Sequence, residues 1–132
     1  MGIEEIHKVE CDIYSPCAVG GAINSETVGE LRCKIVCGGA NNQLATPDMM
    51  SALTASNILY VPDYLANSGG VIIVSTSDGG KLIDLEYHTP EVVTKLNHIC
   101  DVTMEVLRQS AKYNSDTAKV ADLMAERRLV AY

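Results

Sequence analysis

Three side chains at the end of the run ILYVPD and just after it carry groups suited to chemistry at a carbonyl or an imine. The carboxylate of Asp63 can act as a base or stabilise a cation, and the phenol of Tyr64 can donate a proton or stack on an aromatic ring. The amide of Asn67 can orient a carbonyl or a carboxylate. Ordinary structural roles compete with these, because aspartate often forms turns and tyrosine often packs.

A second group of reactive types lies at Glu86, Tyr87 and His88. An imidazole titrates near neutral pH, so His88 suits proton transfer beside the acid and the phenol. We predict Glu86 and His88 as catalytic residues together with Asp63, Tyr64 and Asn67. The alternative for this cluster is a solvated surface loop.

A cluster of side-chain amides follows the apolar run CKIVCGG, at Asn41, Asn42 and Gln43. Amides donate and accept hydrogen bonds without charge, which suits a ribose or a carboxamide better than a phosphate. The alternative is structural, since asparagine also satisfies turns and caps helices.

The first half of the chain alternates between strand and helix patterns. We expect strands in 9–16, 32–39 and 58–63, with a short helix in 20–31 and another that opens at Pro47. This is the βαβ pattern of a parallel sheet. The sequence therefore predicts one α/β domain over residues 1–132, with about three parallel strands and flanking helices.

The second half is mainly helical. The run VIIV at 71–74 fits a strand or the start of a helix, and 77–82 is expected to be a loop. Pro90 opens a long helix that ends at the break 114–116, before a last helix that buries Val120, Ala121 and Met124. The apolar face of the long helix is predicted to comprise Leu96, Ile99, Cys100, Thr103, Leu107 and Ala111.

In an open parallel sheet, ligands bind beyond the carboxyl ends of the strands. Three corners of the chain fall there, at 15–21, 38–44 and 62–70. Each combines a strand exit with glycines, and the last two add side-chain amides. We predict that they form one binding rim for a small molecule. Its predicted binding residues are Cys17, Ala18, Val19, Asn41, Asn42, Gln43, Ser68 and Gly69.

Composition excludes several classes of partner. The net charge is −7, whereas nucleic acid needs a basic face. No apolar run approaches the roughly 18 residues of a membrane span, so we expect a cytoplasmic protein without membrane contact. The five cysteines and three histidines show no ligand spacing. We therefore expect no metal, and reduced thiols packed mostly in the core.

Three stretches resemble a known family: DIYSPCAVGGAIN, CKIVCGGANNQL and YVPDYLANSGGVI. They look like the later part of the NAD domain of leucine, phenylalanine and valine dehydrogenases, with glutamate dehydrogenases as more distant relatives. The resemblance runs from about residue 9 to the end and is poor over 75–92. It implies half of a Rossmann-like domain. By it, Cys17 to Val19 lie along a nucleotide, Asn41 and Asn42 approach the nicotinamide ribose, and Asn67 faces the nicotinamide.

Several features that a dehydrogenase of this family needs are not found in the 132 residues. The turn G-x-G-x-x-G that seats a pyrophosphate is absent, as is the acidic residue that follows it in this fold. The substrate domain, which carries the family's catalytic lysine and aspartate, is not represented. We therefore expect a truncated domain with no cofactor and no dehydrogenase activity alone. The strand in 9–16 should leave an open edge, which favours a homodimer through that edge or through helix faces.

Three functions remain open on these grounds. The favoured one is a non-redox enzyme of specialised metabolism that condenses an amino acid or amine with an aldehyde through an iminium, a Pictet–Spengler-type cyclase. The second is a subunit of a split NAD-dependent amino-acid dehydrogenase. The third is a non-catalytic protein that binds a nucleotide or an amino acid.

Overall fold

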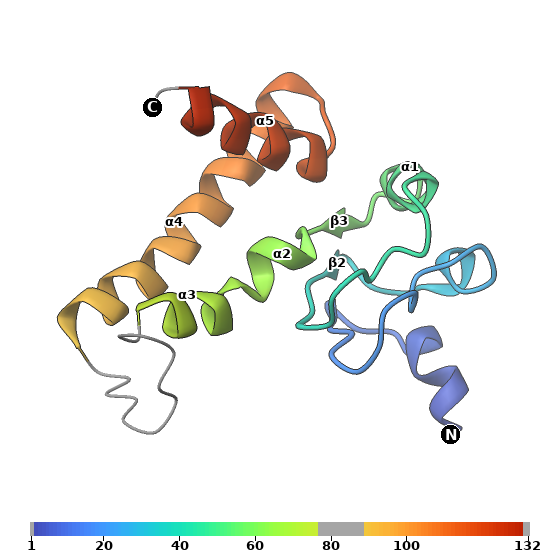
Figure 1. Cartoon of the computed structure of the whole chain (residues 1–132). Coiled ribbons are helices and arrows are strands. Elements are labelled where there is room, and N and C mark those ends of the chain that lie inside the picture. Colours follow the sequence, from blue (N-terminus) through green and yellow to red (C-terminus); the bar gives the residue numbers. More distant parts are fainter. Residues whose placement is uncertain (1, 77–88, 131–132) are drawn as a thin grey trace.

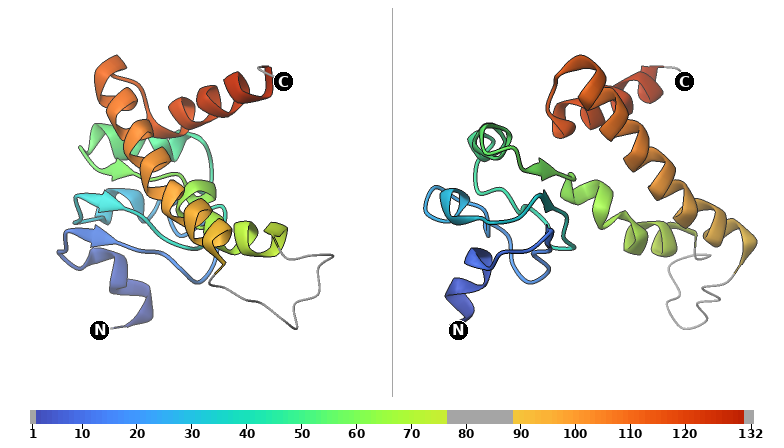
Figure 2. Two further views of the ribbon diagram at one scale, coloured as in Figure 1. Left: turned by 90° about the vertical axis from the view of Figure 1, so that its left-hand side faces the viewer. Right: turned by 180° about the vertical axis from the view of Figure 1, so that it is seen from behind.

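The computed structural model describes residues 2–76 and 89–130. Its centre is a parallel sheet in the order β1 (Ile13–Tyr14), β2 (Ile35–Val36) and β3 (Leu59–Tyr60). Ile13 pairs with Ile35, and Ile35 pairs with Leu59, so the strands are in register across the sheet. Figure 2 shows the strands side by side, with β2 between the other two.

Helices make up most of the remaining described structure (Figure 1). They are η1 (Ile3–Lys8), η2 (Val28–Glu30), α1 (Asp48–Ala55), α2 (Asp63–Ala66), α3 (Ser68–Thr76), α4 (Pro90–Tyr113) and α5 (Thr117–Val130). Three parallel strands with flanking helices and a C-terminal helical segment confirm the predicted half of a Rossmann-like fold. None of the described helices is long and apolar enough to cross a membrane.

One apolar cluster holds α1 against the sheet. Leu53 of α1 is fully buried beside Val36 of β2 and Tyr60 of β3, and Ile23 and Ile58 complete the cluster. The helix begins after Pro47, as predicted, because proline supplies the backbone angle of a first helical turn without wasting an N–H. This packing fixes the loops at the carboxyl ends of β2 and β3.

A second apolar cluster joins α4 and α5 through Val106, Val120 and Ala121. It is tied to the sheet by Thr117, whose buried hydroxyl donates a hydrogen bond to the carbonyl of Tyr60. One outward carbonyl of β3 is therefore satisfied by α5. Asn114 ends α4 in the left-handed conformation, which confirms the predicted break before the last helix.

The predicted helix over 20–31 is wrong. The segment consists of turns and the single 3₁₀ turn η2, because side chains compete for its backbone. The Asn24 carboxamide oxygen accepts from the N–H groups of Glu26 and Thr27, and the Thr27 hydroxyl donates to the Ala22 carbonyl. Ile23 meanwhile forms a bridge to Leu44, which an extended backbone allows and a helix does not.

The second half matches the sequence patterns with one correction. The run at 71–74 belongs to α3, so its helical alternative holds. On α4, Cys100 and Ala111 are exposed, although both were predicted to lie on the apolar face, and the buried positions are Val92 and Val106. Leu96 and Ile99 lie beside Gly69 of α3, and Val102 and Val106 pack against α5, so the buried face of α4 does not include Cys100 or Ala111. The predicted loop at 77–82 lies outside the described residues.

Candidate functional site

The loops after β2 and β3 meet at the carboxyl edge of the sheet. The side-chain amide of Asn67, at the end of α2, donates to the Oδ1 atom of Asn41 at 2.6 Å and more weakly to the Gly39 carbonyl at 3.4 Å. Asn41 is exposed and Asn67 half-buried. Two of the three predicted corners therefore bring their amides together, and each amide keeps hydrogen-bonding groups that the pair does not use.

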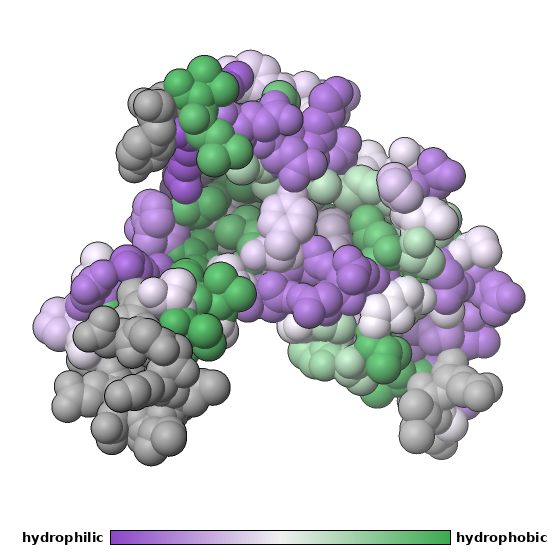
Figure 3. All heavy atoms as spheres, in the orientation of Figure 1, coloured by the Kyte–Doolittle hydropathy of each residue, from purple (hydrophilic) through white to green (hydrophobic). Residues whose placement is uncertain are grey.

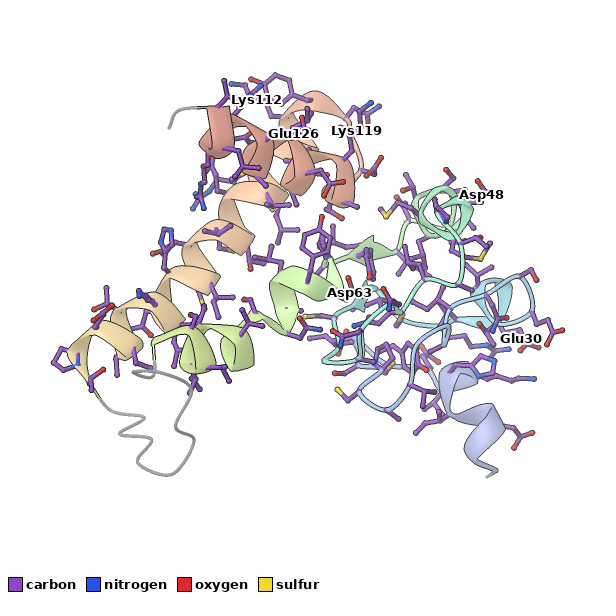
Figure 4. All side chains as sticks on the ribbon, viewed as in Figure 1. Glu30, Asp48, Asp63, Lys112, Lys119 and Glu126 are labelled. Atoms are coloured by element: carbon purple, nitrogen blue, oxygen red, sulfur yellow. The ribbon has the colours of Figure 1, made fainter. Side chains whose placement is uncertain are left out.

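Asp63 links the same two loops from the first position of α2. One carboxylate oxygen accepts from the Tyr64 N–H at 2.8 Å, and the other accepts from the Gln43 N–H at 3.4 Å. Figure 4 shows Asp63 between α2 and the loops of the sheet. Because its carboxylate accepts from two backbone N–H groups, Asp63 holds the two loops in position. This is the turn-forming role that the sequence offered as the alternative to a catalytic one.

Gln43 stabilises the amide loop from inside. Its side chain is fully buried, and its amide nitrogen donates to the carbonyls of Gly38 at 2.7 Å and Ala40 at 2.9 Å. The Oε1 atom is buried without a hydrogen-bond partner among the described residues. The structure therefore places Gln43 beneath the rim rather than on the surface where the sequence led us to expect a ligand.

The loop after β1 completes the rim beside the amides. Gly21 and Asn42 both have positive φ, 70° and 53°, and the Gly21 N–H donates to the Asn42 carbonyl at 2.7 Å. A Cβ atom at Gly20 would lie 2.9 Å from the Asn41 carbonyl oxygen, so the two loops touch through backbone. Asn42 thus has the predicted turn role, while α1 begins at Asp48 and is capped by neither asparagine.

Cys17 is exposed at this rim, and two hydrogen bonds hold its sulfur. Its sulfur forms a hydrogen bond with the Ser15 hydroxyl at 3.3 Å and accepts from the Gly39 N–H at 3.2 Å. These bonds favour the thiolate and lower the pKa of Cys17 below its ordinary value. By contrast, burial together with the nearby charge of Cys17 raises the pKa of Cys37.

We expect iodoacetamide to alkylate Cys17 before Cys37. Because a lowered pKa increases the thiolate fraction at any pH below it, the Cys17 rate should rise and level off at lower pH than the Cys37 rate. Peptide mass spectrometry over a pH series measures both. Ser15→Ala should shift the Cys17 profile to higher pH, whereas the exposed control Ser25→Ala should not. Identical profiles for the two thiols would contradict the assignment.

Tyr64 points away from the amide pair and towards α5. Its hydroxyl donates to the Asp122 carboxylate at 2.7 Å and to the Ala118 carbonyl at 3.3 Å. Burial and the charge of Asp122 raise the pKa of Tyr64. This contact was missed by sequence reasoning, since 58 residues separate the partners and neither position has a distinctive pattern. Asp122 therefore fixes the orientation of the Tyr64 side chain.

The other predicted site residues are placed as follows. Ala18 and Val19 are exposed beside Cys17. The Ser68 hydroxyl donates to the Leu65 carbonyl, and Gly69 lies where a Cβ atom would contact Leu96 of α4 at 3.6 Å. The predicted catalytic residues Glu86 and His88, with Tyr87 between them, lie outside the described residues. Ligand contacts at all these positions stay predictions.

Most of the cysteines are only partly buried, and the wider cleft lies apart from the amide pair. All five cysteines are free thiols and none is fully buried, so the expectation that most pack in the core is wrong. Within 2–76 and 89–130, no three histidine, cysteine, aspartate or glutamate side chains gather as metal ligands would. A cleft of about 780 Å³ between α1 and α5 includes none of the predicted site residues in its lining.

A parallel sheet with backbone loops, a thiol and paired amides at its carboxyl edge has the form of part of a dinucleotide-binding domain. The sequence profile of the Glutamate/Leucine/Phenylalanine/Valine dehydrogenase family matches residues 2–131. The chain belongs to this family. The match begins before residue 9 and spans 75–92, where the three quoted stretches give no resemblance.

Individual relatives agree with this assignment. The chain is 37% identical over 129 residues to the phenylalanine dehydrogenase of Thermoactinomyces intermedius, covering 98% of this chain and 34% of the relative. It is 42% identical over 118 residues to the valine dehydrogenase of Streptomyces albus, covering 89% and 31%. The crystal structure of L-tryptophan dehydrogenase from Nostoc punctiforme superimposes with a TM-score of 0.84 at 32% identity, covering 96% and 36%. The chain thus spans about a third of the length of these relatives.

Proposed function

We propose that this chain supplies the nicotinamide-side part of the cofactor site of an NAD-dependent amino-acid dehydrogenase. The pyrophosphate-binding turn and the groups that activate the amino acid would then come from residues outside these 132, whether on a second polypeptide or on the same one. The chain alone is expected to hold no cofactor, because the residues that would seat a pyrophosphate are not among it.

The observation that carries this proposal is the amide pair of Asn41 and Asn67 at the carboxyl edge of a parallel sheet. Amides can match both the carboxamide and the ribose of a nicotinamide nucleotide without repelling its charges. Asp63 and Gln43 hold the two loops in place from behind. Two amides held in fixed positions can orient a reacting ring for hydride transfer.

The open edge of β1 supports the same proposal. The Asp12 and Tyr14 carbonyls accept from the N–H groups of Ile35 and Cys37 in the β2 segment. Because successive residues of a strand direct their backbone groups to opposite sides, the N–H and carbonyl of Ile13 point away from β2. Ile13 is 55% exposed, and no further strand pairs with β1 in the described part of the chain. Additional strands of a dinucleotide-binding sheet would satisfy this edge.

A chimera tests the proposal. The matching third of the Thermoactinomyces phenylalanine dehydrogenase is replaced by this chain, and NADH formation is followed with phenylalanine, leucine, valine and tryptophan. We expect activity with at least one of them. Asn67→Ala should lower kcat/KM roughly tenfold, the effect of losing one hydrogen bond to a bound group. The control Asn97→Ala, exposed on α4, should leave it unchanged.

A folded chimera that binds NADH but oxidises none of these amino acids would contradict the proposal. The cyclase expected from the sequence stays a prediction, because no contact or comparison bears on it. Its own readout is a condensed product mass from an amine and an aldehyde with the chain alone and no NAD. That product, lost on Asp63→Asn, would favour the cyclase over the dehydrogenase.

A further inference from the structure

A partly open cavity of about 170 Å³ lies where α2, α4 and α5 meet, and its lining includes Tyr64 and Leu65 but neither Asn41 nor Asn67. Figure 3 shows apolar side chains gathered in the recess between these helices. A cavity of about 150 Å³ lined by aliphatic side chains is large enough to hold benzene. The available space therefore suits an isobutyl or phenyl group and is too small for a nucleotide.

The wall of the cavity is almost wholly apolar. It continues the second apolar cluster and is formed by Leu65, Val102, Val106, Ala121, Met124 and Ala125. Tyr64 also lines the cavity, and its hydroxyl is already bonded to Asp122 and Ala118. An uncharged apolar group can thus enter without leaving a buried donor or acceptor unsatisfied.

One charged residue, Arg128, lines the cavity, and it is exposed. None of the lining residues is acidic, and none of the ion pairs among the described residues includes Arg128. A guanidinium offers a planar fork of N–H groups that matches a carboxylate. The cavity therefore pairs an apolar interior with a carboxylate-binding group.

We propose that this cavity binds a small apolar monocarboxylate, with its branched or aromatic group between α2, α4 and α5 and its carboxylate on Arg128. This site is separate from the proposed nicotinamide site and does not depend on it. Free amino acids should bind less well, because no acidic side chain lines the cavity to receive an ammonium group. Binding would brace α5 against α4 and α2.

Calorimetric titration of the 132-residue chain with phenylacetate tests the site. We expect saturable binding with a dissociation constant on the order of 1 mM, typical of a ligand of about ten heavy atoms with one charged contact. Phenylacetamide, which lacks the charge, should bind at least about tenfold more weakly. Acetate, which lacks the ring, should not bind measurably.

Three variants locate the ligand. Arg128→Gln should weaken phenylacetate binding about tenfold or more, while the neighbouring Arg127→Gln, which does not line the cavity, should change it less than about twofold. Ala125→Leu adds bulk at the cavity wall and should abolish binding while circular dichroism shows an unchanged helical content. Absence of binding by the folded parent chain would overturn the proposal. So would an affinity for phenylacetate in the Arg128→Gln and Ala125→Leu variants that equals that of the parent chain.

Discussion

Replacing Gly38 with alanine will destabilise the corner between β1 and β2. A Cβ atom at this position would lie 2.2 Å from the Pro16 carbonyl oxygen and 2.6 Å from its backbone nitrogen. Both are backbone atoms of a buried proline, so neither can move without displacing β1. We expect a loss of about 3 kcal/mol or more in the free energy of unfolding, at the upper end of overpacking effects. Urea unfolding followed by circular dichroism measures it.

Gly29→Ala is the matched control, because a Cβ atom there has nothing within 4 Å. Its effect should stay within about 0.5 kcal/mol, as for other exposed positions. The carbonyl of Gly38 also accepts from Gln43, so a shift of this corner would move the amide loop. In the chimera, Gly38→Ala should therefore lower activity together with stability. Equal unfolding midpoints for the two alanine variants would refute the steric argument.

The sheet and its order of elements were predictable because strand signals in this chain are local. Short apolar runs that end in glycine or proline gave β2 and β3, and Pro47 and Pro90 marked the starts of helices. The prediction of a helix over 20–31 was wrong for an equally local reason. Asn24 and Thr27 satisfy their own turn, and this competition with the helix is not visible in apolar periodicity.

The site was predictable in location and only partly in detail. The rule that ligands bind beyond the carboxyl ends of parallel strands placed Asn41 and Asn67 on one rim, where the structure brings them within hydrogen-bond distance. Burial of Gln43 and the contact of Tyr64 with Asp122 depend on tertiary packing. Such contacts join residues whose spacing in sequence carries no signal, so no periodicity argument could find them.

Replacing Ile13 with proline will weaken pairing at the open edge of β1 and leave the chain folded. The N–H of Ile13 points away from β2, so its loss breaks no bond within the sheet, and proline is tolerated at such edge positions. We expect the chain to self-associate through this edge, giving about twice its 14.2 kDa mass by sedimentation equilibrium. Ile13→Pro should weaken that association roughly a hundredfold, the equivalent of about two lost hydrogen bonds.

Ile13→Val keeps the N–H and the strand-forming shape, so it should retain the parent mass. A monomeric parent chain at micromolar concentration would rule out the predicted homodimer. A dimer unaffected by Ile13→Pro would instead place association on the helices. In the chimera, the edge is expected to receive strands of the phenylalanine dehydrogenase, so Ile13→Pro should also reduce NADH formation. Loss of both properties would mean that self-association occupies the edge that the complete cofactor site needs, so the two states would exclude each other.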